Sequence, residues 1–247
     1  MRLKKLRSIS LIQPALLALA ISAASTAFAA IDNKGSEFFI AFLPNPLSSG
    51  QQVELHLTAE TPTTVHIEYP AGTPTFTSSV NLIPGSVSIV SLPEAASSSW
   101  NANVIRKNIV RAYSASNQEF IAYSINRKIA TSDAALNLPI DALNTQYLVS
   151  AYNPRFVGSQ FNVYAAYDQT TVTIKPKNNI TGHPAGIPFN ITLQKGEGYY
   201  GLSSTTDTNT GNLIGTEISA DKPIGVVNGN GCTLVPTGTV ACDHIFE

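Results

Sequence analysis

Apolar and polar residues alternate along several short segments of this chain, with the two-residue period of strands that have one side in solvent. The clearest alternation covers residues 53–57, 65–69, 161–165 and 172–174. Turn-forming residues separate these segments at short intervals, which is typical of a β-sandwich or a jelly-roll-like barrel. Further strands are expected at 86–92, 109–113, 119–125, 189–193, 217–220 and 224–228, and short helices at 97–104 and 139–143. The pattern predicts an all-β fold with little helix.

Three segments of the chain recur in the same order at a separation of about 107 residues. The aligned pairs are EFFIAFLPN (37–45) with QYLVSAYNP (146–154), TTVHIEYP (63–70) with TTVTIKP (170–176), and 114–121 with 219–224. This spacing is too long for a solenoid repeat, whose period is about 20 to 50 residues. We therefore predict two tandem, similar β-sandwich or jelly-roll-like units, at residues 30–132 and 146–247, joined by a linker at 133–145.

The N-terminus has the three parts of a secretory signal peptide, which are a basic start, an apolar run and a small-x-small motif. They are Arg2, Lys4, Lys5 and Arg7, the run 9–21, and Ala27-Phe28-Ala29. A membrane anchor is the alternative, but Gln13 and Pro14 interrupt the run, which is short for a spanning helix of about 20 residues. We predict cleavage after residue 29, no membrane span in the mature chain, and a secreted or cell-surface location.

Charge argues against a nucleic-acid partner. The chain has 15 Lys and Arg and 16 Asp and Glu. Residues 1–29 contain four of the basic residues and none of the acidic ones, so the mature net charge is about −5. The densest basic cluster is Arg106, Lys107 and Arg111, which is smaller than the patch that phosphate binding needs. Since 43% of the residues are apolar and recur periodically, disorder is not expected either.

Cys232 and Cys242 are the only two cysteines, and in an exported chain they are expected to form a disulfide. A zinc site formed by Cys232, Cys242 and His244 is the alternative, although the spacing fits no common finger. His56 and His66 lie on the polar sides of two expected strands joined by a turn, so they are candidate cross-strand neighbours. With Glu54 or Glu68 they would suit a metal, and otherwise they belong to a solvated face.

The residues with catalytic chemistry show no catalytic arrangement. The sequence has no Gly-x-Ser-x-Gly elbow. Glycoside hydrolysis needs two carboxylates across a cleft, and the candidates are more economically explained as turn or cap residues. They are Asp133, Asp141, Asp168 and Asp207. Asp207 and Asn209 also begin a stretch like a calcium loop, from which Asn212 and Ile218 depart. No cofactor is expected.

Several segments together resemble the N-terminal domain of the IgG Fc-binding protein family, which occurs in mucus-associated animal proteins and in exported bacterial proteins. They are 35–45, 132–133, 138–143, 170–174, 219–224, 229–232 and 242–244. The resemblance covers nearly the whole mature chain and is closest to the exported bacterial members. It implies an extracellular, noncatalytic β module for binding or adhesion, and it favours the pairing of Cys232 with Cys242. Members of the family run on beyond the last segment, so the second unit is expected to be shortened at its C-terminus.

From these patterns we expect an exported binding module whose loops recognise a protein or a glycan. Mucin-like and Fc-like partners follow from the resemblance alone. The candidate loops are 44–52, 152–160 and 203–212, and the candidate contacts are Tyr152, Asn153, Arg155 and Phe156. The plainer interpretation is that Tyr152 and Phe156 pack in the second core. The alternative functions are a secreted hydrolase of polysaccharides and a structural spacer in a larger surface protein.

Overall fold

The computed structural model describes residues 32–45, 50–128, 131–236, 238–239 and 243–247. Strands make up most of the described chain, and α1 (Ala95–Ser98) is the single α-helix within it. The predicted all-β class is therefore confirmed. The predicted signal peptide, residues 1–29, lies outside the described residues.

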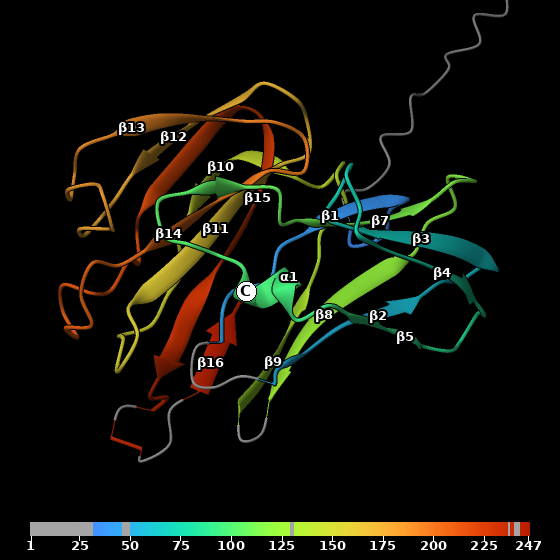
Figure 1. Ribbon diagram of the computed structural model, residues 1–247, viewed down its shortest axis with the longest axis horizontal. Coiled ribbons are helices and arrows are strands. Elements are labelled where there is room, and N and C mark those ends of the chain that lie inside the picture. Colours follow the sequence, from blue (N-terminus) through green and yellow to red (C-terminus); the bar gives the residue numbers. More distant parts are fainter. Residues whose placement is uncertain (1–31, 46–49, 129–130, 237, 240–242) are drawn as a thin grey trace, which may run out of the picture. The chain divides into compact units, whose positions relative to one another are not determined.

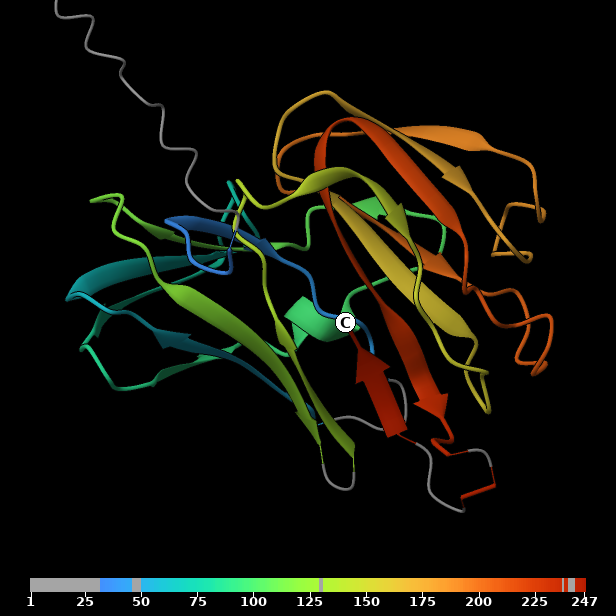
Figure 2. The same ribbon diagram turned by 180° about the vertical axis from the view of Figure 1, so that it is seen from behind.

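The N-terminal part of the described chain is a sandwich of two four-stranded antiparallel sheets (Figures 1 and 2). The first sheet has the order β1 (Glu37–Ile40), β7 (Val110–Ser114), β3 (Thr63–Tyr69) and β4 (Phe76–Leu82). The second has the order β5 (Ser88–Leu92), β2 (Gln52–Thr58), β8 (Ile121–Lys128) and β9 (Thr131–Leu136). Alternate residues of each strand point inward, so Val53, Leu55, Val65 and Ile67 meet in one buried core.

The C-terminal part is one eight-stranded sheet built around a long strand, β15 (Glu217–Thr233). The first half of β15 pairs with β10 (Asn144–Leu148) and β12 (Thr170–Lys175), and β12 pairs with β13 (Phe189–Leu193). The second half pairs with β11 (Ser159–Ala165) and β16 (Asp243–Phe246), while β14 (Gly198–Leu202) joins β11 to β6 (Ile105–Arg106). Strand β15 thus passes between two layers, which enclose a second core that includes Phe161, Val172 and Ile218.

The order of strand pairing is the same in both parts. The order β1-β7-β3-β4 corresponds to β10, first half of β15, β12, β13, and the order β5-β2-β8-β9 corresponds to β14, β11, second half of β15, β16. The registers agree as well. Leu55 lies between Val90 and Ser124, and Val163 lies between Tyr199 and Val226. Tandem duplication stays a prediction, which this shared order favours.

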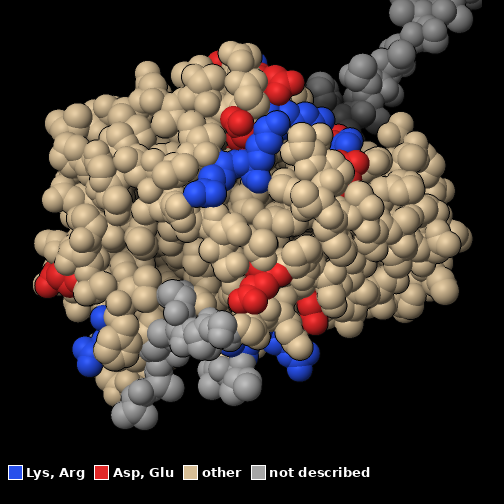
Figure 3. Space-filling model, viewed as in Figure 1, with Lys and Arg blue, Asp and Glu red and all other residues tan. Residues whose placement is uncertain are grey.

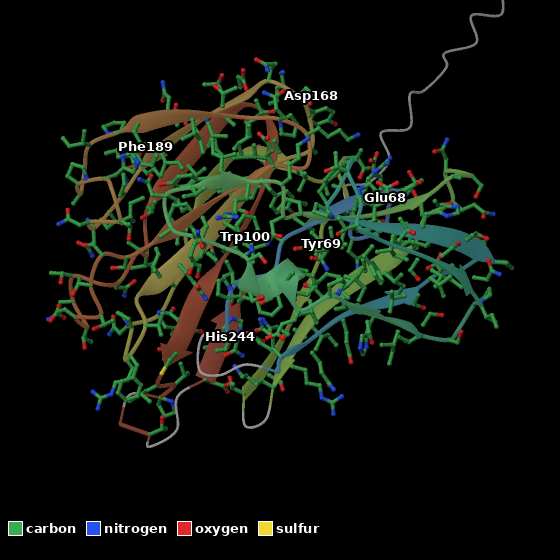
Figure 4. All side chains as sticks on the ribbon, viewed as in Figure 1. Glu68, Tyr69, Trp100, Asp168, Phe189 and His244 are labelled. Carbon is green, nitrogen blue, oxygen red and sulfur yellow. The ribbon has the colours of Figure 1, made fainter. Side chains whose placement is uncertain are left out.

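A third apolar cluster joins the two parts. Residues Phe39, Ala41, Leu43, Trp100 and Ile109 of the N-terminal part are buried against Tyr164, Tyr200, Val227 and Phe246 of the C-terminal part. In Figure 4, Trp100 and His244 lie between the two sets of strands. Burial of aromatic and branched side chains on both sides makes this junction a third core.

Four consecutive backbone carbonyls in this junction are bound by side chains from α1, from two strands and from Trp100. Because residues 42–45 lie outside any ladder, these carbonyls would otherwise be buried without a partner. The hydrogen bonds run from Trp100 Nε1 to Phe42 O (2.9 Å), Ser97 Oγ and Asn126 Nδ2 to Leu43 O (2.8 and 3.1 Å), Gln160 Nε2 to Pro44 O (3.0 Å), and Lys128 Nζ to Asn45 O (3.2 Å). The segment is therefore held by both parts.

The helix predictions are largely wrong. α1 ends at Ser98, and Asn103 adopts φ 61°, so a helix cannot continue to residue 104. Residues 139–143 form a turn, in which the Ile140 N–H donates to the Glu37 carbonyl (3.0 Å) and not to its own segment. The expected linker at 133–145 begins inside β9 and ends inside β10, so the connection between these strands is residues 137–143. Within the described residues, no helix is long and apolar enough to span a bilayer.

Candidate binding surface

Two of the three predicted recognition loops lie against each other at one end of the C-terminal part. The Ser159 N–H donates to the Gly211 carbonyl (3.2 Å), and Asn212 Nδ2 donates to Asn153 Oδ1 (2.8 Å). Gly211 is needed for this contact, because a Cβ there would lie 2.9 Å from Cγ of Pro154. In the third loop, 44–52, residues 46–49 lie outside the described residues.

Both predicted aromatic contact residues are at the surface. Phe156 is 64% exposed and Tyr152 is 42% exposed, so neither packs in the second core. The guanidinium of Arg155 lies 5.3 Å from the centre of the Phe156 ring, within the range of a cation–π contact. Arg155 and Phe156 thus present one exposed aromatic and cationic surface.

Asn153 and the backbone of Tyr152 fasten the loop to the sheet beneath it. The Asn153 carbonyl accepts a hydrogen bond from Thr233 Oγ1 (2.8 Å), while the Tyr152 N–H donates to Asn230 Oδ1 (2.8 Å). The Arg155 N–H donates to the Cys232 carbonyl (3.2 Å). Asn153 therefore positions the loop, and the side chains free to meet a partner are those of its neighbours.

Asp207 organises its own loop. Its Oδ1 accepts hydrogen bonds from the N–H groups of Thr210 (2.9 Å) and Asn209 (3.0 Å) and from the Thr210 hydroxyl (3.0 Å). The bonds from Thr210, followed by that from Asn209, lower the pKa of the Asp207 carboxyl. Within the described ranges, no group of three or more His, Cys, Asp or Glu could hold a metal ion.

Two of the other candidate carboxylates also accept backbone hydrogen bonds. Asp133 accepts from the N–H groups of Ala134 (2.8 Å) and Phe246 (2.6 Å), which ties β9 to β16. Asp168 accepts from the N–H of Lys195 (3.0 Å). These roles are the turn and cap functions that the sequence favoured for them.

The expected proximity of His56 and His66 is wrong. β2 and β3 belong to different sheets, because the turn between them crosses from one layer of the sandwich to the other. His56 Nε2 instead lies 2.9 Å from Glu54 Oε2 on its own strand, and the His66 ring lies 5.4 Å from that of Tyr113. The two side chains do not form a common site.

The cysteine pairing stays a prediction. Cys232 is buried in β15, whereas Cys242 lies outside the described residues. The residues next to them in the sequence, Thr233 and Asp243, pair between β15 and β16. His244, the third member of the zinc alternative, is buried at the junction of the two parts.

Charged side chains are sparse on the face shown in Figure 3, where Lys and Arg form a central group beside Asp and Glu and others lie apart at the lower rim. Arg111, from the densest basic cluster in the sequence, is engaged by acidic neighbours. Its Nε lies 2.7 Å from Glu37 Oε1, and its Nη1 lies 3.6 Å from Glu68 Oε2. Lys195 Nζ lies 3.4 Å from the same Glu37 oxygen.

The structure also contains a groove that the sequence did not predict. Its volume is about 480 Å³, and it lies at the turns of the N-terminal part, where Phe120, Pro84 and Ala59 form apolar walls. Lys34 and Glu60 line it as an ion pair (2.8 Å). Its lining comes from turns far apart in the sequence, so no local pattern could have shown it.

Comparison with known proteins finds a similarity over the C-terminal part. Residues 133–247 match the family model described as IgGFc binding protein. The chain is 30% identical, over 134 residues and 50% of its length, to the human IgGFc-binding protein, of whose length it spans 2%. No solved structure matches the chain significantly.

Proposed function

We propose that this chain is an extracellular, noncatalytic module that binds a protein partner through the loops of its C-terminal part, since residues 133–247 match the model of the IgGFc-binding protein family. The family supports protein binding in general. Fc, mucin and glycan partners, and a place at or beyond the cell surface, are finer proposals that also rest on the signal-like N-terminus and the two cysteines of the sequence.

The exposed pair of Arg155 and Phe156 is the observation that carries the proposal. Aromatic and Arg side chains supply much of the binding energy in protein interfaces, because they offer large contact area and directed hydrogen bonds. Covering the Phe156 ring, which is 64% exposed, with a partner would be favourable because it removes apolar surface from water. The proposal therefore places the partner over Phe156.

The loop that carries this pair is rigidly supported, which favours recognition. Asn230, Thr233 and Asn212 bind Tyr152 and Asn153, just before Arg155 in the chain, so little backbone order would have to be acquired there on binding. Pre-organisation of this kind lowers the entropy that binding loses. A spacer without a partner would not need such support beneath an exposed aromatic side chain.

A direct binding experiment tests the proposal. Purified residues 30–247 would be passed over immobilised IgG Fc and mucin and applied to a glycan array. We expect saturable binding to one class, weakened at least about tenfold by Phe156→Ala and by Arg155→Ala, since truncation of a hot-spot residue costs 2 kcal/mol or more.

Ile83→Ala is the matched control, because Ile83 is also an exposed apolar residue but lies in the turn between β4 and β5 of the other part. It should bind as wild type does. Absence of binding to all three classes would overturn the proposal and favour a spacer. Equal binding by wild type and both loop variants would remove the assigned surface.

A further inference from the structure

Residues 38–43 lie at the junction of the two parts and bury side chains on both sides of the extended segment. Phe38, Ile40 and Phe42 point into the core of the N-terminal part, whereas Phe39, Ala41 and Leu43 point into the cluster shared with the C-terminal part. An extended segment turns successive side chains to opposite sides, so one segment can serve two cores. All six residues are buried for this reason.

The corresponding segment of the C-terminal part buries side chains on only one side. Residues 146–154 align with 37–45, and this places Leu148 at the position of Phe39, and Tyr152 at that of Leu43. Val149 and Ala151 point into the second core, but Leu148 is 68% exposed and Tyr152 is 42% exposed. The side that is an interface in the first segment is open in the second.

Ile214 extends this open surface. The Gly215 N–H donates to the Val149 carbonyl (2.9 Å), which places the adjoining residue beside the segment, and Ile214 is 53% exposed. We name the surface formed by Leu148, Ser150, Tyr152 and Ile214 the 148 face. Three exposed apolar side chains on neighbouring segments are more than the scattered single residues that a monomeric surface carries.

The surface of the C-terminal part that receives residues 39–43 also corresponds to an open surface, which lies on the N-terminal part. Within the chain, the N-terminal part covers the outer side of β14, β11 and the second half of β15, where Tyr200, Tyr164 and Val227 lie. By strand order, the corresponding surface of the N-terminal part is the outer side of β5, β2, β8 and β9.

That outer side carries a row in register across all four strands, with apolar or aromatic residues on β5, β8 and β9 and His56, which is paired with Glu54, on β2. Ile89, His56, Tyr123 and Leu136 are successive cross-strand partners. Ile89 is 58%, Tyr123 41% and Leu136 43% exposed. With strands about 4.8 Å apart, the row is about 14 Å long. We name it the 123 face.

We infer that the 148 face of one chain docks on the 123 face of a second copy, in the manner in which the two parts of one chain dock on each other. The two open surfaces are the counterparts of the two sides of a junction that the chain already forms. Because the surfaces differ, the contact is heterologous, and it leaves one 148 face and one 123 face open at the ends of every assembly. Copies of the chain are therefore expected to assemble head to tail.

Self-association should depend on concentration. The internal junction forms between parts of one chain, whose effective concentration is of the order of mM for a short linker, whereas separate chains lack this advantage. Sedimentation velocity on residues 30–247 should therefore cover about 5 μM to about 1 mM. We expect wild type to pass from monomer to species larger than a dimer across that range.

Two single variants separate the two faces. Leu148→Glu and Tyr123→Glu each place a charge in one face, so each variant alone should remain monomeric over the whole range. An equimolar mixture should form a 1:1 dimer that does not grow, because one variant keeps the 123 face and the other keeps the 148 face. Ile83→Glu is the control, since Ile83 is as exposed as Leu148 (68%) but lies on neither face, and it should associate as wild type does.

Far-UV circular dichroism and the fluorescence of Trp100 would establish that every variant is folded. A wild-type chain that stays monomeric up to about 1 mM would overturn the inference. So would a Leu148→Glu or Tyr123→Glu variant that still associates as wild type does, or a mixture that stays monomeric. This outcome is independent of the loop proposal, because Phe156 and Arg155 are unchanged in all of these variants.

Discussion

His244 offers the sharpest test of the junction between the two parts. Its side chain is 1% exposed, and neither ring nitrogen has a hydrogen-bond partner. Burial lowers the pKa of His244 to about 4, although the nearby Pro44 carbonyl and Asp243 favour the charged ring, and Lys128 disfavours it. The folded protein therefore holds a neutral imidazole at this position well below pH 6.5.

The sign and size of the effect on stability follow from this pKa. Between pH 6.5 and pH 4 the unfolded chain binds the His244 proton and the folded chain does not, so stability falls as the pH decreases. From pH 7.5 to pH 5.0 the loss is about 2 kcal/mol. At neutral pH neither nitrogen of the uncharged ring forms a hydrogen bond, and a buried polar group without a partner costs about 1–3 kcal/mol.

His244→Leu is the informative substitution, because Leu has a similar volume and no polar atoms to bury. Urea unfolding at pH 7.5 and pH 5.0 can be followed through Trp100, the one tryptophan of the chain, which lies in the same junction. We expect the variant to be at least as stable as wild type at pH 7.5. Between pH 7.5 and pH 5.0 it should lose about 2 kcal/mol less than wild type does.

Other carboxyl groups do not disturb this comparison. Burial raises the pKa of Asp133, so its ionised form destabilises the folded state as the pH rises, but this contribution is present in wild type and variant alike. The difference between the two proteins isolates His244. If wild type and His244→Leu lose the same free energy of unfolding between the two pH values, the imidazole is not held neutral in this junction.

Three further changes test other features. Trp100→Phe should lower the free energy of unfolding by about 2–4 kcal/mol in urea denaturation followed by circular dichroism, because the buried Phe42 carbonyl loses its donor and the junction loses volume; an unchanged midpoint would contradict this. Gly229→Ala should cost 2 kcal/mol or more, because its Cβ would lie 1.8 Å from a carbonyl oxygen of β16, and a stable variant would show that β16 is not packed here. Intact-mass measurement should show two hydrogens gained on reduction if Cys232 and Cys242 are paired, whereas two free thiols would refute the disulfide.

Local pattern predicted the strands better than their partners. The expected strand at 189–193 coincides with β13, and the alternation at 53–57 and 65–69 lies within β2 and β3. Alternation shows which side of a strand is buried but not which sheet the strand joins, so it could not show that the two candidate neighbours, His56 and His66, lie in different sheets. Sandwich connections that change layers leave no local signal.

Pro223 lies within β15, which was expected as two strands. The sequence predicted separate strands at 217–220 and 224–228, and a proline such as Pro223 removes a donor from a strand ladder. The structure keeps β15 continuous, because the described ladders to β11 and β12 skip residues 221–223, where the strand passes between layers. The missing N–H therefore has no consequence for pairing at Pro223.

The sequence supplies candidate contact residues for the site but not the hydrogen bonds around them. Exposed aromatic and basic residues in a loop can be chosen from sequence alone. The bonds that position them, such as those from Thr233 and Asn212 to Asn153, join residues far apart in the chain. The same holds for the carbonyls of residues 42–45, whose donors come from α1, β8, β11 and Trp100.

Comparison of residues 38–43 with residues 147–152 indicates that association through the 148 face should be weak. Residues 38–43 are apolar at every position, as expected when both sides are permanently buried. In the second segment, the open side carries Leu148, Ser150 and Tyr152 in place of Phe39, Ala41 and Leu43, so two of its three positions gain a hydroxyl group. A hydroxyl loses free energy when it is buried without a partner, and it is tolerated in water. The open side is therefore suited to a contact that forms and dissociates, which is why we expect association to appear only at high concentration.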